Sequence, residues 1–140
     1  MGGVPSRDAR IAHAALHAEL WNAGKKTDWL ASFRSIASAG VTLFDPVGTE
    51  EKTGFDTAFT ENWDRFQAIL KLRMVTAQVN GNEMAWTIEN RFGTEPNIQI
   101  GYSIETFAWD SAGNLLIKTY YPMPEKVGQR SDPYQQVLGR

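Results

Sequence analysis

The sequence of 140 residues contains no cysteine and only two histidines, His13 and His17, four positions apart. Without cysteine the chain forms neither a disulfide nor a thiolate nucleophile. A zinc site would need several carboxylates beside so few histidines, and no ligand spacing in the sequence supplies them. We therefore predict a protein that works without a metal ion or another cofactor.

Long hydrophobic runs and an excess of charge of one sign are also missing. No apolar run is long enough to span a bilayer, and the N-terminus lacks the hydrophobic stretch of a signal peptide. The 14 basic and 16 acidic side chains are spread along the chain, which argues against a nucleic-acid or membrane surface. With 42% hydrophobic residues, we expect one cytoplasmic domain with a single core.

The first half of the chain has helical periodicity. A first helix is predicted from Asp8, as its N-cap, to Asn22, with Gly24 ending it. A second helix is predicted from Asp28 to about Ser38, and a short strand then ends at Asp45. The aromatic spacing between Phe55 and Phe66 predicts a third helix.

The second half changes to the alternation that is typical of β-strands. The predicted strands are Ile69–Val79, Met84–Phe92, Ile98–Trp109 and Leu115–Tyr121, separated by turns rich in Asn and Gly. Helices followed by antiparallel hairpins indicate an α+β fold with the helices on one face of a curved sheet. Residues 125–140 read as a polar tail, in which Tyr134, Val137 and Leu138 are candidates for docking on a partner subunit.

Asp45 is the first candidate for a functional residue. It ends the apolar run Val41-Thr42-Leu43-Phe44 and precedes Pro46. A carboxylate in such surroundings is costly to bury unless it is hydrogen-bonded or its pKa rises. It either caps a turn or acts as a general base toward an acidic carbon.

Glu105 is the second candidate, because the alternation of its strand pairs it with Gly101, Ser103 and Phe107 on one face. If this face is the concave one, Glu105 points into the interior; the alternative is an exposed glutamate on the outer face. Two carboxyl groups in one cavity rarely ionise together, so one of Asp45 and Glu105 is expected to stay protonated.

His17 lies on a helix face with Leu16 and Leu20, and that face is expected to turn toward the sheet. As a neutral imidazole it could donate a hydrogen bond to a developing oxyanion. Alternatively it is the base, with Asp45 or Glu105 orienting its other nitrogen. For His13 we expect a packing role only.

Four segments carry a resemblance to a known family: Glu19-Leu20-Trp21-Asn22-Ala23-Gly24, Phe44-Asp45-Pro46-Val47-Gly48 with Gly54, Phe107-Ala108-Trp109-Asp110-Ser111-Ala112-Gly113 and Thr119-Tyr120-Tyr121. With them the chain resembles the ketosteroid-isomerase branch of the NTF2-like (SnoaL-like) superfamily, over residues 1–124. The resemblance implies a cone-shaped, cystatin-like α+β barrel. In it, three N-terminal helices pack on a curved, mainly antiparallel sheet that encloses one pocket.

The resemblance also assigns roles. Asp45 matches the catalytic aspartate, Glu105 the protonated acid of the oxyanion hole, His17 the oxyanion-hole tyrosine, and Tyr121 an aromatic wall position. Histidine and glutamate thus replace the family's tyrosine and aspartate. The substrate-binding positions that we expect in the pocket are Trp63, Trp86, Asn90, Ser103, Phe107, Thr119 and Tyr121.

These residues support an isomerase- or lyase-type enzyme without a cofactor, which removes a proton next to a carbonyl on a small hydrophobic, cyclic or aromatic substrate. One alternative is a dehydratase or other eliminating lyase, and a second is a polyketide cyclase; each would use a His17–Asp45 pair. A third is a domain that binds a ligand without catalysis. The resemblance further implies a homodimer through the outer sheet face, where the alternation places Ile100, Tyr102 and Ile104.

Overall fold

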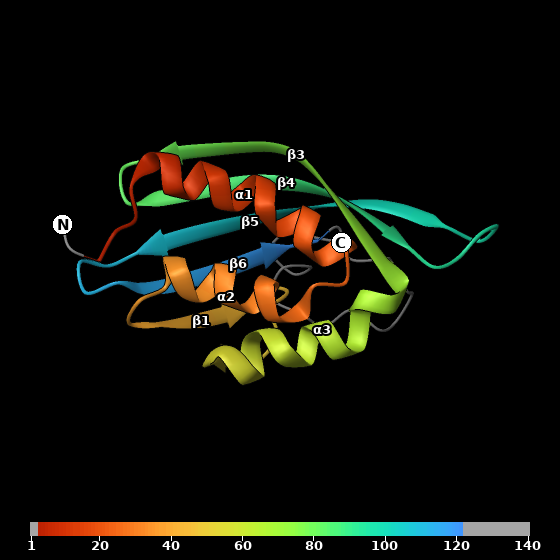
Figure 1. Ribbon diagram of the computed structural model, residues 1–140, viewed down its shortest axis with the longest axis horizontal. Coiled ribbons are helices and arrows are strands. Elements are labelled where there is room, and N and C mark those ends of the chain that lie inside the picture. Colours follow the sequence, from red (N-terminus) through yellow and green to blue (C-terminus); the bar gives the residue numbers. More distant parts are fainter. Residues whose placement is uncertain (1–2, 122–140) are drawn as a thin grey trace.

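The structure is a computed structural model that describes residues 3–121, and it confirms the α+β fold (Figure 1). Three helices lie against one face of a six-stranded sheet. The helices are α1 (Arg7–Asn22), α2 (Lys26–Ile36) and α3 (Glu61–Phe66). The strands are β1 (Gly40–Phe44), β2 (Lys52–Thr53), β3 (Leu70–Asn80), β4 (Glu83–Phe92), β5 (Gln99–Trp109) and β6 (Asn114–Tyr120).

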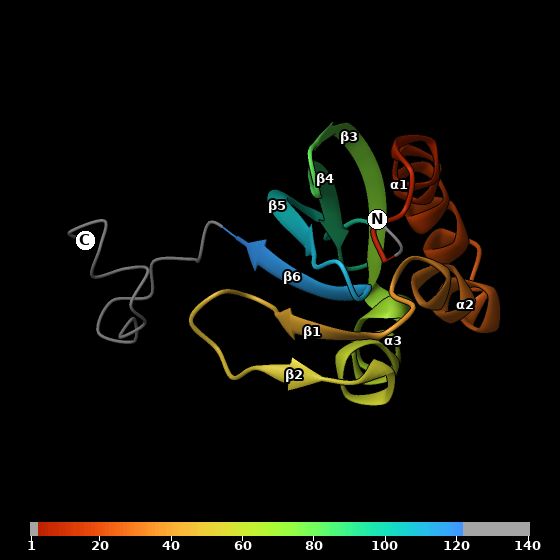
Figure 2. The ribbon, with the colours of Figure 1, turned by 90° about the vertical axis from the view of Figure 1, so that its left-hand side faces the viewer.

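The sheet has the strand order β2-β1-β6-β5-β4-β3 and is curved around the helices (Figure 2). Strands β3 to β6 pair antiparallel in succession, whereas β1 lies parallel to β6. The register of β3 against β4 shifts between Met74 and Thr76, and such a bulge bends a strand. Strand β2 was not predicted, because two residues carry no alternation to detect.

The predicted start of the first helix at Asp8 is wrong by about half a turn. The N-cap is Ser6, whose hydroxyl accepts a hydrogen bond from the Ala9 amide at 3.1 Å. Serine and aspartate are equally good N-caps, so the sequence offered two starts. Asp8 instead lies in the first turn, where a carboxylate still favours the helix dipole. Gly24 ends the helix as predicted, with φ of 71°.

The other two helices also differ from the prediction at their ends. Helix α2 begins at Lys26 rather than Asp28 and ends at Ile36 rather than Ser38. The third predicted helix is a composite: a π-helical turn at Asp56–Thr60, then α3, then a 3₁₀ turn at Gln67–Ile69. The aromatic spacing continues through all three pieces, which is why periodicity reads them as one helix.

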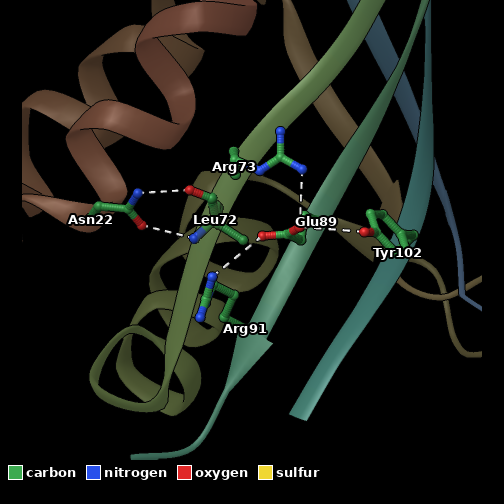
Figure 3. Close-up of polar contacts among 6 residues, drawn as sticks. All are labelled: Asn22, Leu72, Arg73, Glu89, Arg91 and Tyr102. Atoms are coloured by element: carbon green, nitrogen blue, oxygen red, sulfur yellow. Dashed lines mark hydrogen bonds and ion pairs between the residues drawn. The ribbon is translucent and has the colours of Figure 1, made fainter. Parts of the chain in front are cut away.

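Polar side chains connect α1 to the sheet. The Asn22 side chain exchanges two hydrogen bonds with the backbone of Leu72, donating to its carbonyl at 2.7 Å and accepting from its amide at 2.8 Å (Figure 3). The Trp21 indole donates to the Leu70 carbonyl at 2.8 Å. These bonds fix the C-terminal end of α1 over β3, one turn beyond His17.

The outer face of the sheet combines exposed apolar side chains with one buried charge. The Glu89 carboxylate accepts a hydrogen bond from Arg73 at 3.0 Å and lies 3.9 Å from Arg91, with the Tyr102 hydroxyl at 3.4 Å (Figure 3). Ile100, Tyr102 and Ile104 are about half exposed on the same side.

No helix in residues 3–121 is both long and apolar enough to cross a membrane. The predicted domain end at residue 124 and the predicted tail 125–140, with Tyr134, Val137 and Leu138, lie outside the described residues.

Candidate active site

A cavity opens between the helices and the concave face of the sheet, and it has two adjoining parts. The inner chamber has a volume of about 70 Å³ and is lined by side chains that include His17, Asp45 and Glu105. The outer chamber has a volume of about 620 Å³. Both chambers share one set of lining residues: Asp45, Asn62, Phe66, Leu70, Asn90 and Tyr121. The shared set places Asp45 at the junction between the chambers.

Asp45 directly follows β1. Val41 and Leu43 of this strand are buried in the core, so the strand leads from the core to Asp45. Its Oδ2 accepts a hydrogen bond from the Asn62 side chain at 3.0 Å. Burial raises the pKa of Asp45, opposed by contact with the Tyr121 hydroxyl, by the positive charge of Lys52 and by the Asn62 bond. The carboxylate is thus a stronger base than a solvated aspartate while keeping two donors that hold it in place.

Glu105 lies on β5 and lines the inner chamber, so of the two faces that the strand alternation left open it takes the concave one. The Trp86 indole donates to its Oε1 at 2.5 Å, and the Thr119 hydroxyl donates to its Oε2 at 2.8 Å. Burial, and next the charge of Asp45, raise the pKa of Glu105 to about 7. Below pH 7 Glu105 is therefore mostly protonated, and the two neighbouring carboxyl groups are not both fully ionised until the pH exceeds that value.

His17 is held by an indole rather than by a carboxylate. The Trp29 N–H donates to Nδ1 of His17 at 3.1 Å. An indole nitrogen only donates, so Nδ1 must be the acceptor, and in the neutral ring the proton is on Nε2. Burial, and next the nearby His13, lower the pKa of His17 to about 3. His17 is therefore a neutral N–H donor at the inner chamber.

The same contact argues against His17 as the base. A base would need a free lone pair on Nε2, which moves the ring proton to Nδ1 and points it at the Trp29 N–H. Neither Asp45 nor Glu105 is bonded to Nδ1, as the alternative reading of His17 required. The geometry favours the oxyanion-donor role for His17.

Replacing Trp29 by Phe is expected to remove the hydrogen bond that keeps the proton of neutral His17 on Nε2. Loss of a donor to the neutral ring removes a bond that favours the uncharged form, so the pKa of His17 rises from about 3. ¹⁵N NMR of the ring nitrogens is the measurement, with a mixture of tautomers expected in place of one. Trp63→Phe is the matched control, because Trp63 packs on Trp29 at 5.2 Å between ring centroids. An unchanged His17 spectrum in Trp29→Phe contradicts the assignment.

Trp86 connects the two donors of the site. Its ring stacks on His17 at 5.0 Å with an interplanar angle of 13°, and on His13 at 5.8 Å and 17°. The indole of Trp86 also bonds Glu105. His13 is fully buried in this stack, and neither of its nitrogens has a hydrogen-bond partner among residues 3–121. Its packing role agrees with the expectation from sequence.

Four of the seven predicted substrate-binding residues line the inner chamber: Asn90, Ser103, Phe107 and Tyr121. Asn90 donates to the Ser103 hydroxyl at 2.9 Å, so these two form one polar spot on the sheet side. The other three lie behind the wall. Thr119 and Trp86 are fully buried and bond Glu105, and Trp63 packs against Trp21 and Trp29.

Sequence reasoning missed Asn62 and Trp29. Asn62 shares the helical spacing of Phe55, Phe59 and Phe66, and a polar residue in that apolar stripe was a detectable signal. Trp29 stands in an ordinary buried stripe of α2, and nothing in its spacing indicates that its N–H meets His17.

Replacing Glu105 by Gln mimics the protonated acid and tests its pKa through stability. Because the pKa of about 7 in the folded state exceeds the ordinary value of 4.5 for a glutamate, the folded state keeps the proton to higher pH, and stability is lost as pH rises from 4.5 through 7. The loss amounts to roughly 3 kcal/mol. In urea unfolding we expect the free energy of unfolding of Glu105→Gln, relative to that of the wild type, to increase from pH 5 to pH 8. A difference that does not change with pH refutes the raised pKa.

No group of three or more metal-ligating side chains (His, Cys, Asp or Glu) occurs within the described part of the chain. What the site holds is two carboxyl groups with raised pKa values and one neutral imidazole in a largely apolar cavity.

No family model matches this chain, and no curated protein matches it. Solved structures do. SalBIII, an epoxide hydrolase/cyclase-like enzyme with a role in pyran ring formation in polyether salinomycin, is similar with a TM-score of 0.63 and 12% identity, over 84% of this chain and 94% of that one. A cystatin-like fold protein of unknown function from Methylobium petroleophilum PM1 is similar with a TM-score of 0.65 and 17% identity, over 92% and 86%.

A third similar structure is a SnoaL-like polyketide cyclase from Jannaschia sp. CCS1, with a TM-score of 0.59 and 11% identity, over 79% of this chain and 86% of that one. At these identities the structural similarity shows the fold alone. It confirms the cystatin-like α+β architecture that the resemblance implied, and the activity has to be argued from the residues of the site.

Proposed function

We propose that this protein is a cofactor-independent enzyme of the isomerase or lyase type that removes a proton next to a carbonyl group of a small hydrophobic substrate. The observation that supports the proposal is that Asp45, Glu105 and His17 converge on one largely apolar cavity, where burial raises the pKa of both carboxyl groups and lowers that of His17. A base for a carbon acid and donors for the resulting oxygen anion are what enolisation requires.

The reaction follows from the positions of these groups. The substrate carbonyl oxygen enters the inner chamber, where His17 Nε2–H and the Glu105 carboxylic acid donate to it. Asp45, at the chamber junction, takes the proton from the adjacent carbon, and the electron pair of that C–H bond moves to the oxygen. Returning the proton to a different carbon completes an isomerisation, and loss of a group from the next carbon completes an elimination.

Ring closure is the second candidate, because the same enolate could attack an electrophilic carbon within its own substrate. The names of two similar structures, a polyketide cyclase and an epoxide hydrolase/cyclase-like enzyme, support it. The Asp45 step is common to both candidates. A base formed by His17 and Asp45 has less support, because Trp29 holds Nδ1 of His17.

The test is exchange of the α-protons of 2-tetralone in D₂O, followed by NMR, together with binding of 2-naphthol as a mimic of its enolate. We expect exchange faster than in buffer, and competition between the two compounds. Binding of 2-naphthol without exchange would indicate a ligand-binding domain. If 2-naphthol does not bind and 2-tetralone does not exchange faster than in buffer, the proposed function is refuted.

We also propose a homodimer through the outer sheet face. Ile100, Tyr102 and Ile104 are 53%, 50% and 48% exposed there, in one row along β5. Ile104→Lys is expected to convert a dimer into a monomer in analytical ultracentrifugation without changing the circular dichroism, because the side chain faces away from the core. A wild-type protein that sediments as a monomer at high concentration refutes the dimer.

A further inference from the structure

The outer chamber differs from the inner one in charge. Its walls are largely apolar, with Pro46, Phe66, Leu70 and Phe92 among the lining residues. Two cationic side chains also line it, and they come from different elements: Lys52 from β2 and Arg65 from α3. Figure 2 shows β2 at the edge of the sheet, leading toward the helical segment that contains α3.

What distinguishes these two cations from the other basic residues of the fold is their position, because both line the outer chamber. Lys26 is paired with Asp64 at 2.8 Å, and Arg73 with Glu89 at 3.0 Å. Within residues 3–121, neither Lys52 nor Arg65 makes a salt bridge. The Arg65 guanidinium lies over the Phe66 ring, 5.5 Å from its centroid, which orients it at the chamber wall.

Two carboxylates line the same chamber. Asp45 lies at the junction, deeper in the cavity, where Asn62 donates to it. The charge of Lys52 lowers the pKa of Asp45, but the two side chains form no salt bridge. Glu50 is exposed in the loop after β1. Lys52 is half-buried, so its ammonium group is less screened by water than that of a surface lysine.

The sizes of the two chambers fix which part of a substrate meets these cations. The inner chamber, about 70 Å³, holds the carbonyl and its nearest atoms beside His17 and Glu105. The α-carbon then lies at the Asp45 junction, and the rest of the molecule extends into the outer chamber of about 620 Å³. The end farthest from the carbonyl is therefore the end that reaches Lys52 and Arg65.

We infer that the substrate is an amphiphilic carbonyl compound with an apolar body and an anionic group at the end remote from the reacting carbonyl. Lys52 and Arg65 bind that group at the rim of the outer chamber. This inference rests on the proposed function, since it takes the carbonyl to lie in the inner chamber. The anion is a carboxylate or a tetrahedral group such as phosphate.

The test compares ligands that differ only at the remote end. We would measure calorimetric binding of 2-naphthol, 6-hydroxy-2-naphthoate, its neutral carboxamide and 6-hydroxynaphthalene-2-sulfonate at pH 6. The carboxylate or the sulfonate is expected to bind about three- to tenfold more tightly than the carboxamide, as for partly exposed ion pairs. The gain should shrink as salt rises from 0.05 M to 0.5 M, two concentrations chosen for the assay.

The variants are Lys52→Gln, Arg65→Gln and the double variant, with Arg7→Gln as a matched control that removes a cation from the start of α1. The anion preference is expected to vanish in the double variant and to persist in Arg7→Gln. A wild type that binds carboxamide and both anions equally refutes the inference but leaves the proposed function standing, provided that 2-naphthol binds. If no naphthol binds and 2-tetralone shows no exchange above buffer, both the inference and the proposed function are refuted. A preference for sulfonate over carboxylate assigns the rim to a tetrahedral anion.

Discussion

Asp45→Asn is expected to slow α-proton exchange by roughly 10²–10⁴-fold, the usual contribution of a general base, while 2-naphthol binds as tightly as to the wild type or more tightly. Both effects have one cause. The amide cannot accept the proton from carbon, but it also no longer repels the negative oxygen of an enolate mimic in the same cavity. Exchange is measured by NMR and binding by calorimetry on the same preparations.

The combination of results separates a base from a structural carboxylate. Asp64→Asn is the control, because Asp64 is an exposed carboxylate on α3 whose partner is Lys26 outside the cavity. It should leave exchange and binding unchanged. If Asp45→Asn loses naphthol binding as well as exchange, Asp45 supports the cavity wall instead. If exchange survives in Asp45→Asn and disappears in His17→Gln, the base is His17, and the tautomer set by Trp29 is wrong.

Local pattern was enough to single out Asp45 and Glu105 as candidates. The apolar run before Asp45 indicated a buried carboxylate at a strand end. Strand alternation grouped Glu105 with Ser103 and Phe107 but left two faces open, and the structure shows the concave one. Their arrangement relative to one another depends on the register between β5 and β6, which pairs Glu105 with Thr119. No periodicity within one segment contains that information.

The partners of these residues were not predictable, because they depend on contacts between segments far apart in sequence. Trp86 and Trp29 were expected to be wall or core, yet their N–H groups bond Glu105 and His17. A tryptophan reads as apolar bulk in any hydrophobic pattern, and its one donor is visible only once the helices are placed on the sheet.

Acidification is expected to unfold this protein through its two buried histidines. Both are neutral in the fold, with the pKa of His13 lowered to about 4 and that of His17 to about 3. Because the unfolded chain binds these protons near pH 6.5, stability is lost as pH falls below 6.5. At pH 4 the two losses sum to about 6 kcal/mol, comparable with the whole stability of many domains.

Glu105 opposes this loss over part of the range. Its raised pKa means that the folded state gains up to roughly 3 kcal/mol as pH falls from 7 to 4.5. The wild type should therefore weaken slowly down to about pH 4.5 and steeply below it. In Glu105→Gln the compensation is absent, and the decline should begin at once below pH 6.5. Thermal and urea unfolding across pH 3.5–8 measure both curves.

His13→Phe is the variant that assigns the acid sensitivity. Phenylalanine fits the stacking partners of His13, which are Phe33, Trp86 and Phe107, and it removes two buried nitrogens without partners in the described chain. We expect unchanged or higher stability at pH 7 and a further gain of about 3 kcal/mol at pH 4. His13→Leu is a second variant, which removes the imidazole without adding the larger phenyl ring that could overpack the core. If neither variant flattens the curve between pH 6.5 and pH 4, His13 is already protonated in the fold. The His13–Trp86–His17 stack would then carry a positive charge beside Glu105, and a carboxylate would be the stable form of that residue at neutral pH.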